Sequence, residues 1–178
     1  MYKLSSIKTQ FSRKQRGFGA LEVMIGLMIG TLVLIGAVVW YQKLSNSSNN
    51  GDELENLSSL ITSVRHLKTS SGYGANGTNL VPILNNAGGI PDNMGFNAGV
   101  PLNAWGGNVT IVSTGLGFTV TYAGLPAENC IFLATKGASS STMTTRINGG
   151  AAITGEVTAA AANTGCNAAT NTLAWTAR

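Results

Sequence analysis

The longest hydrophobic run of this 178-residue chain lies near its N-terminus. Residues 18–40 comprise 23 positions and contain one charged side chain, that of Glu22. Because an α-helix rises about 1.5 Å per residue, a run of this length crosses the roughly 30 Å hydrocarbon core of a bilayer. The pattern predicts a membrane-spanning helix, with Trp40, Tyr41 and Lys43 at the membrane interface.

A second helical pattern follows a polar run at residues 45–51. Large apolar side chains recur there at spacings of three and four, which places them on one face of a helix. Acidic residues lie near the expected start of the helix and basic residues near its end, as the macrodipole favours. We therefore expect residues 45–71 to form an amphipathic helix that packs on a globular head, with residues 45–51 as a bend or polar seam. The apolar stripe is Leu54, Leu57, Leu60, Ile61, Val64 and Leu67, the acids are Asp52, Glu53 and Glu55, and the bases are Arg65 and Lys68.

The rest of the chain has the features of a head with an antiparallel sheet. Glycine and proline are frequent in residues 72–101, which predicts loops. Apolar and polar residues then alternate in residues 108–113 and 118–122, on either side of a glycine-rich turn, and this pattern predicts a β-hairpin. In the last expected strand we place Leu173 and Trp175 on opposite faces. The other expected elements are a short helix from Pro126 and Glu128 to about Leu133, a surface loop or edge strand at 137–145, a turn at 148–150 and a last strand at 172–176.

Charge is concentrated at the start of the chain. All five charged residues before position 18 are basic, and without them the formal net charge of +4 becomes −1, leaving the new terminus aside. A basic segment beside a membrane helix marks its cytoplasmic side, so we do not interpret the basicity as a nucleic-acid-binding patch. The remainder is poor in charge and of a size for one exported domain. The basic residues are Lys3, Lys8, Arg13, Lys14 and Arg16.

Cys130 and Cys166 are the only cysteines of the chain. An even pair in an exported domain indicates a disulfide. A redox dithiol or a metal site would need clustered ligands such as C-x-x-C, whereas 35 residues separate the two cysteines and the single histidine, His66, is distant in the sequence. We expect no metal, no cofactor and no catalytic residue, with His66 exposed to solvent.

The carboxylate of Glu22 requires a partner, because a lone charge inside a membrane helix costs on the order of 2.5 kcal/mol or more. Cleavage after Gly17 would supply one, since the new ammonium of Phe18 would lie one helical turn away on the same face. The basic stretch followed by Gly17, Phe18 and Glu22 resembles the processing junction of a type IV prepilin. The resemblance implies that a prepilin peptidase cleaves after Gly17 and methylates Phe18, and that Glu22 acts in fibre assembly.

Two further segments narrow the resemblance. Residues 102–107 (Leu-Asn-Ala-Trp-Gly-Gly) and 125–130 (Leu-Pro-Ala-Glu-Asn-Cys), with the hairpin between them and the terminal strand, are similar to those of the PilS-type major pilins of thin type IVb pili. The implied fold is α+β, the type IV pilin fold, in which a long N-terminal helix packs on an antiparallel β-sheet head with a C-terminal disulfide. Residues 72–101 would then be a variable loop that packs on neighbouring subunits.

The resemblance also implies an organisation and a function. Residues 1–17 would be a cleaved leader, 18–44 the transmembrane and polymerisation helix, 45–71 its amphipathic half and 72–178 the pilin head. We expect the major subunit of a type IVb pilus, a helical homopolymer for adhesion, aggregation or conjugative mating. Its other partners would be the prepilin peptidase and the inner-membrane assembly machinery. The precursor would reside in the inner membrane and the assembled filament outside the cell.

Other interpretations of the same residues fit less well. A secretory signal peptide has a shorter apolar core without an internal acid, and a plain membrane anchor leaves Glu22 unexplained. A pseudopilin of a type II secretion system shares the junction and the helix, but its head typically lacks such a cysteine bridge. A minor pilin or a membrane-anchored binding module is a further alternative. An anchored enzyme would need a catalytic motif, and we find none in the sequence.

Overall fold

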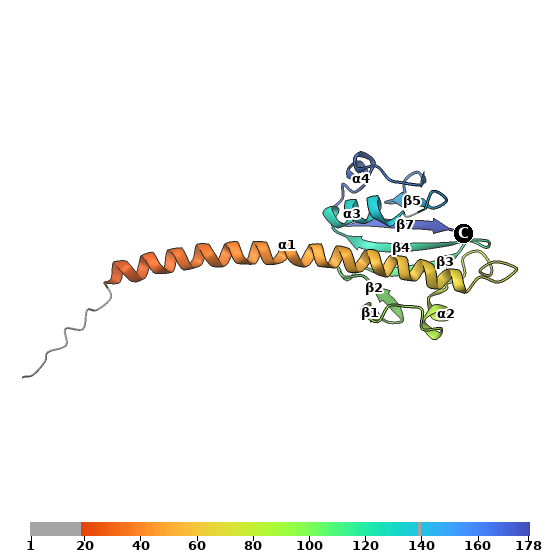
Figure 1. Ribbon diagram of the computed structural model, residues 1–178, viewed down its shortest axis with the longest axis horizontal. Coiled ribbons are helices and arrows are strands. Elements are labelled where there is room, and N and C mark those ends of the chain that lie inside the picture. The colour runs from red at the N-terminus through yellow and green to blue at the C-terminus, as the bar shows by residue number, and fades with distance from the viewer. Residues whose placement is uncertain (1–18, 139) are drawn as a thin grey trace, which may run out of the picture. The chain divides into compact units, whose positions relative to one another are not determined.

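The computed structural model describes residues 19–138 and 140–178. The chain divides into two compact units, with the boundary between Gln42 and Lys43. The first helix, α1 (Ala20–His66), begins in the first unit and ends in the second, which also contains the other described helices and strands (Figure 1). We call residues 72–178 of this second unit, which follow α1, the head.

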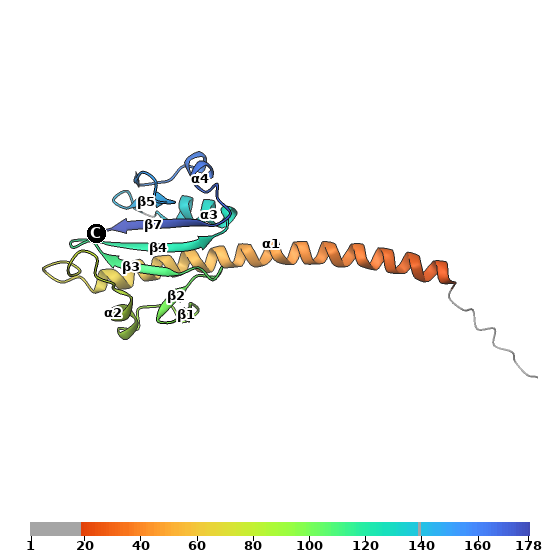
Figure 2. The same ribbon diagram turned by 180° about the vertical axis from the view of Figure 1, so that it is seen from behind.

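The head is built on a five-stranded antiparallel sheet in the order β3-β4-β7-β5-β6, with β1 and β2 paired in a separate ribbon (Figures 1 and 2). The remaining helices are α2 (Val81–Asn86), α3 (Ala127–Gly137) and α4 (Ala159–Gly165). The strands are β1 (Gly95–Asn97), β2 (Val100–Leu102), β3 (Val109–Ser113), β4 (Phe118–Leu125), β5 (Thr144–Ile147), β6 (Ile153–Thr154) and β7 (Asn171–Ala177).

The predicted hairpin and terminal strand are both present. Strands β3 and β4 pair from Val109 opposite Tyr122 to Ser113 opposite Phe118. The terminal strand β7 lies in the middle of the sheet, between β4 and β5, so the end of the chain completes the sheet rather than extending its edge. The expected turn at residues 148–150 also forms, with a hydrogen bond from the Gly150 N–H to the Ile147 carbonyl (2.9 Å).

The placement of Leu173 and Trp175 on opposite faces is wrong. Alternate residues of β7 are buried along its whole length, and both of these side chains are fully buried. Side chains of a strand alternate between faces, so residues two apart point the same way. Trp175 packs edge-on against Tyr122 of β4, with ring centroids 5.5 Å apart, and both residues belong to the core.

The predicted stripe of α1 packs against this sheet. Leu57, Leu60 and Val64 are fully buried in the core, whereas His66 is exposed as expected. The packing is close: a Cβ added to Gly137 of α3 would come within 2.9 Å of a Leu57 methyl and 3.0 Å of the Trp175 ring. Burial of the stripe is therefore what attaches the second half of α1 to the head.

Two expectations about α1 need correction. The helix is unbroken through residues 45–51, so this run is a polar segment of α1 and not a break. Asp52, Glu53 and Glu55 consequently lie far from the start of the helix, and the macrodipole does not account for them. Glu53 is instead buried against the head, with 3% of its surface exposed.

Several short elements differ from the expectation. The segment at residues 72–101 contains α2, β1 and part of β2 and is therefore not only loop. Helix α3 continues four residues beyond Leu133, and the alanine-rich stretch forms α4, whose first turn is capped by Thr158. Such elements are too short for a clear periodicity, so their conformation depends on packing against the sheet.

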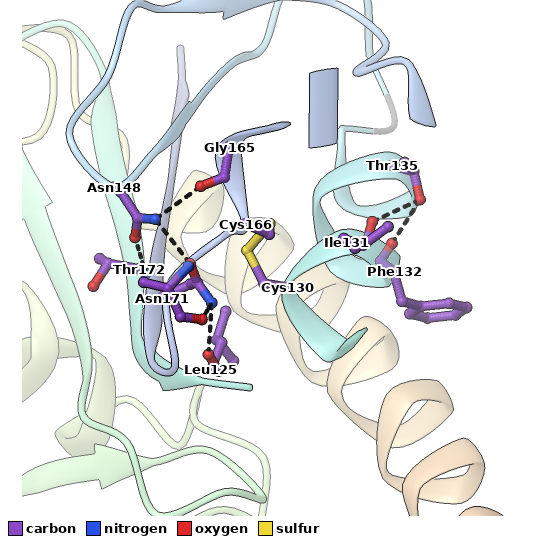
Figure 3. The surroundings of a disulfide bond; sticks show 11 residues. Leu125, Cys130, Ile131, Phe132, Thr135, Asn148, Gly165, Cys166, Asn171 and Thr172 are labelled. Atoms are coloured by element: carbon purple, nitrogen blue, oxygen red, sulfur yellow. Dashed lines mark hydrogen bonds between the residues drawn. A yellow bond between two sulfur atoms is a disulfide. The ribbon is translucent and has the colours of Figure 1, made fainter. Parts of the chain in front are cut away.

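The predicted disulfide joins Cys130 of α3 to Cys166 at the end of α4 (Figure 3), with a Cα–Cα distance of 5.8 Å. Both cysteines are buried. Beside the bridge, the Asn148 amide donates to the Gly165 carbonyl (2.9 Å) and to Asn171 Oδ1 (2.8 Å). The bridge and these hydrogen bonds hold α4, the 148–150 turn and the start of β7 together.

Replacing Cys130 with Ser should destabilise the head. The bridge connects residues 36 positions apart, and in the entropic account its loss costs about 3 to 4 kcal/mol, which is a large share of the roughly 5 to 15 kcal/mol that holds a domain folded. Thermal unfolding of the full chain in detergent should shift to lower temperature, and less protein should reach the cell surface.

The matched variants are Cys166→Ser and the double variant. Because all three lack the same bond, their unfolding temperatures should agree. An unchanged unfolding temperature in Cys130→Ser, or free thiols that can be alkylated in the native wild-type protein, would contradict a structural role for the bridge.

Candidate assembly site

The first half of α1, which runs from Ala20 to Gln42, presents an apolar surface that the rest of the described chain does not cover. The side chains of residues 20–38 and 40–42 are all exposed, and Leu21, Trp40 and Tyr41 expose 72%, 72% and 75% of their surfaces. By length and composition this part of α1 can cross a membrane. Apolar surface of this extent is unfavourable in water, so the segment requires lipid or other protein around it.

Glu22 lies in the first turn of α1, where the macrodipole favours a negative charge. The backbone N–H groups of Glu22 and Val23 donate to the Gly19 carbonyl at 2.9 Å and 3.3 Å. Gly17 and Phe18, the predicted cleavage and methylation site, lie outside the described residues. The pairing of the Phe18 ammonium with Glu22 therefore stays a prediction.

A buried row of polar residues on α1 was not predicted from the sequence. Asn50, Glu53 and Asn56, which we call the polar row, expose only 8%, 3% and 4% of their surfaces. Residues three apart lie on the same side of a helix, so the row runs beside the apolar stripe. Sequence reasoning missed it because asparagine and glutamate are mostly exposed. The only signal in the sequence was that these three polar residues are spaced three apart, as residues on one side of a helix are.

The polar row makes specific contacts with two parts of the head. The Asn129 amide of α3 donates to Asn50 Oδ1 (2.9 Å), and both side chains are buried. The Ala104 N–H, in the loop between β2 and β3, donates to Glu53 Oε1 (2.7 Å). The second carboxylate oxygen of Glu53 and the hydroxyl of Tyr122 are both buried without a hydrogen-bond partner. The row thus ties α1 to α3 and to the loop that contains Ala104.

Burial raises the pKa of the Glu53 carboxyl above its usual value. The Ala104 N–H and the side chains of Tyr122 and Asn56 act in the opposite direction, while the negative charge of Asp52 adds to the increase. The Tyr122 hydroxyl lies near enough to the Glu53 carboxyl to lower its pKa, although the geometry between them is not that of a hydrogen bond. Burial and the neighbouring Glu53 raise the pKa of Tyr122 well above its usual value.

The Leu-Asn-Ala-Trp-Gly-Gly motif is folded around the side chain of Asn103. Its amide nitrogen donates to the Ala123 carbonyl (2.8 Å), and its amide oxygen accepts hydrogen bonds from the N–H groups of Trp105 (3.1 Å) and Gly107 (2.9 Å). The turn that results presents the Ala104 N–H to Glu53. The motif is therefore a structural element that fixes a backbone donor against α1.

Two hollows lie on the described part of the head. An apolar hollow of about 470 Å³ lies beside α4 and is lined by residues such as Ile147, Ile153 and Ala161, and a polar one of about 400 Å³ lies beside Asp52 and Glu53. Within residues 19–138 and 140–178, no three His, Cys, Asp or Glu side chains gather in a group that could hold a metal ion.

Comparisons with known proteins agree with this geometry. The profile of the family described as PilS N terminal matches residues 47–178. Among solved structures, the chain is similar to the type IV b pilin from Salmonella typhi, with a TM-score of 0.59 and 24% sequence identity. That match covers 70% of this chain and 97% of the other chain. A comparison with curated proteins gives no match.

The region that matches the family includes the second half of α1, the whole five-stranded sheet and both cysteines. The structural similarity supports the predicted α+β fold, in which a long N-terminal helix packs on an antiparallel sheet and a disulfide closes the C-terminal region. Because the family match covers most of its length, the chain belongs to the PilS family of type IVb pilins, whose members are structural subunits and not enzymes.

Proposed function

We propose that this protein is the major structural subunit of a type IVb pilus. The observation that carries the proposal is the uncovered apolar surface of α1: the side chains of residues 20–38 and 40–42 are all exposed, and among them only Glu22 is charged. Such a surface suits lipid in an inner-membrane precursor and the same helix of other copies in a filament. The PilS family match and the Cys130–Cys166 bridge favour a pilin over a secretion pseudopilin.

Two forces would act in assembly. Burial of the apolar side chains between residues 20 and 42 supplies most of the cohesion of the extracellular filament, because it keeps a large apolar area out of contact with water. Glu22 supplies specificity. A carboxylate among packed helices is costly without a partner, and the methylated ammonium of Phe18 on a neighbouring subunit would compensate it. The pair would thereby set the axial position of each incoming subunit.

The proposed partners are identical subunits, the prepilin peptidase and the inner-membrane assembly machinery, and the assembled product is an extracellular filament for adhesion, aggregation or mating contact. Electron microscopy of cells with and without the gene tests this directly. Filaments labelled by an antibody against the head in the wild type alone would support a major subunit. Unlabelled filaments of equal number in both strains would overturn it.

Processing should produce a filament protein that begins at a methylated Phe18. Glycine lets an extended backbone pass through the peptidase site where a side chain would obstruct it, so Gly17→Val should block cleavage. Mass spectrometry of the N-terminal peptide from sheared filaments measures both. Lys14→Gln changes the leader without touching the junction and should still be cleaved. Filaments built from subunits that retain Met1 would contradict the proposed junction.

Replacing Glu22 with Val should separate membrane insertion from assembly. The variant removes the charge and makes the helix more apolar, so the cleaved protein should remain in the membrane. Filaments should decrease about tenfold or more, since loss of roughly 1.4 kcal/mol of pairing changes an equilibrium tenfold. Counts of filaments per cell and immunoblots of membrane fractions provide the two measurements.

Thr31→Val is the matched control for Glu22→Val. Thr31 is an exposed, uncharged polar residue of the same helix whose hydroxyl bonds only to the local Met28 carbonyl. Its replacement should leave filament numbers unchanged. Wild-type filament numbers in Glu22→Val would remove the carboxylate from assembly, and failure of cleavage in that variant would transfer its role to the peptidase.

A further inference from the structure

The apolar stripe does not by itself define where along α1 the head is attached. Its leucine, isoleucine and valine residues recur every three or four positions, as in Leu57, Leu60, Ile61 and Val64. A shift of α1 by three residues, about 5 Å, again brings apolar side chains to three of these four positions, with a serine at the fourth. Something else must distinguish one turn from the next.

We propose that the polar row is a register lock, in which Glu53 is the positioning residue that determines which turn of α1 packs on the head. A polar side chain buried in a helix interface fixes the register of the partners, because any other register leaves its hydrogen-bonding groups unpaired. The row can act in this way, since Asn50 accepts from the Asn129 amide and Glu53 from the Ala104 N–H, and a shift of one turn would move both acceptors away from these donors.

Glu53 is the member of the row that no neighbour can replace. After a shift of one turn its position would be taken by Asn49 or Asn50 in one direction and by Asn56 or Leu57 in the other. The asparagine side chains are one methylene shorter and leucine accepts no hydrogen bond. The Ala104 N–H would lose its acceptor at 2.7 Å, and an unpaired buried donor is unfavourable.

Burial of the Glu53 carboxyl makes the lock sensitive to pH. The titratable groups that face its carboxyl are Asp52 on α1 and Tyr122 on β4, while the loop at residues 103–107 carries none. The folded protein binds the Glu53 proton more tightly than the unfolded chain, because burial raises the pKa of this carboxyl. The contribution of Glu53 to stability is then greatest below its unfolded pKa of about 4.3 and decreases as the pH rises through its folded value.

The lock bears on assembly because α1 is one helix from Ala20 to His66. Whatever fixes residues 50–56 on the head also fixes how many residues of helix separate the head from Glu22. This consequence rests on the proposed function, but the register itself can be measured in the full chain in detergent, without filaments. Failure of the lock and failure of the proposed function are therefore distinguishable.

Pulsed EPR distances measure the register. Spin labels would be attached to Ser48→Cys, at an exposed position on α1 before Glu53, and to Leu116→Cys, at an exposed position in the β3–β4 turn. The Tyr73 N–H donates to the Gly115 carbonyl (2.8 Å) shortly after α1 ends, so this turn lies near the C-terminal end of the helix. A sliding movement of α1 therefore changes the distance between the labels.

In the Glu53→Leu variant, which removes the acceptor, we expect a second distance displaced by about 5 Å, the length of one turn. Glu53→Gln keeps an oxygen acceptor for the Ala104 N–H and should show the single wild-type distance. Glu55→Leu is the matched control, because Glu55 is exposed two residues away, and it should also match the wild type. A single wild-type distance in Glu53→Leu would overturn the proposal.

A second measurement does not depend on the folding of Glu53→Leu. Thermal unfolding of the wild type and of Glu53→Gln would be compared between pH 4 and 8, with Glu55→Gln as the control. The advantage of Glu53→Gln over the wild type should increase as the pH rises, because only the wild type acquires a buried charge. A difference that stays constant across this range would overturn the role of Glu53 inside the lock.

Discussion

The contact between α1 and the sheet is the interaction on which the rest of the head depends. Leu57, Leu60 and Val64 fill one side of a core whose other side is formed by Trp175, Tyr122 and their neighbours. Because α1 continues without a break to Ala20, this contact also connects the head to the exposed apolar segment. The second half of this helix therefore has an apolar stripe that the head covers, and the first half has an apolar surface that the described chain leaves uncovered. The first half needs lipid or other protein to keep its apolar area out of water.

Contacts between segments that are distant in the sequence hold the head together. Strand β7 is the last element of the chain and occupies the middle of the sheet, where it pairs with both β4 and β5. The disulfide and the hydrogen bonds of Asn148 and Asn171 hold the start of β7 beside α3 and α4. The head is rich in glycine and poor in charge, and the apolar core of a small domain is modest. The disulfide and these hydrogen bonds therefore stabilise this region in addition to apolar burial.

Polar groups inside this core have a different role from the apolar ones. The apolar stripe supplies attraction without direction, whereas Asn50 and Glu53 make hydrogen bonds that exist in one arrangement only. The motif around Asn103 belongs to the same system, since its folded loop presents the Ala104 N–H to Glu53. The docking of the helix on the head thus explains the motif at residues 102–107, which narrowed the family resemblance.

Features that depend on local pattern or composition could be predicted from the sequence: the apolar run with Glu22, the stripe of α1, the β3–β4 hairpin, the terminal strand and the cysteine pair. Periodicity is a property of neighbouring residues, so it can be read without coordinates. Four other features follow from packing between distant segments: β7 is central, α2 and α4 are helical, Leu173 and Trp175 both point into the core, and Glu53 is buried. Strand order and the burial of a polar side chain depend on partners far away in the chain, and a carboxylate such as Glu53 enters a core only because the Ala104 N–H meets it there.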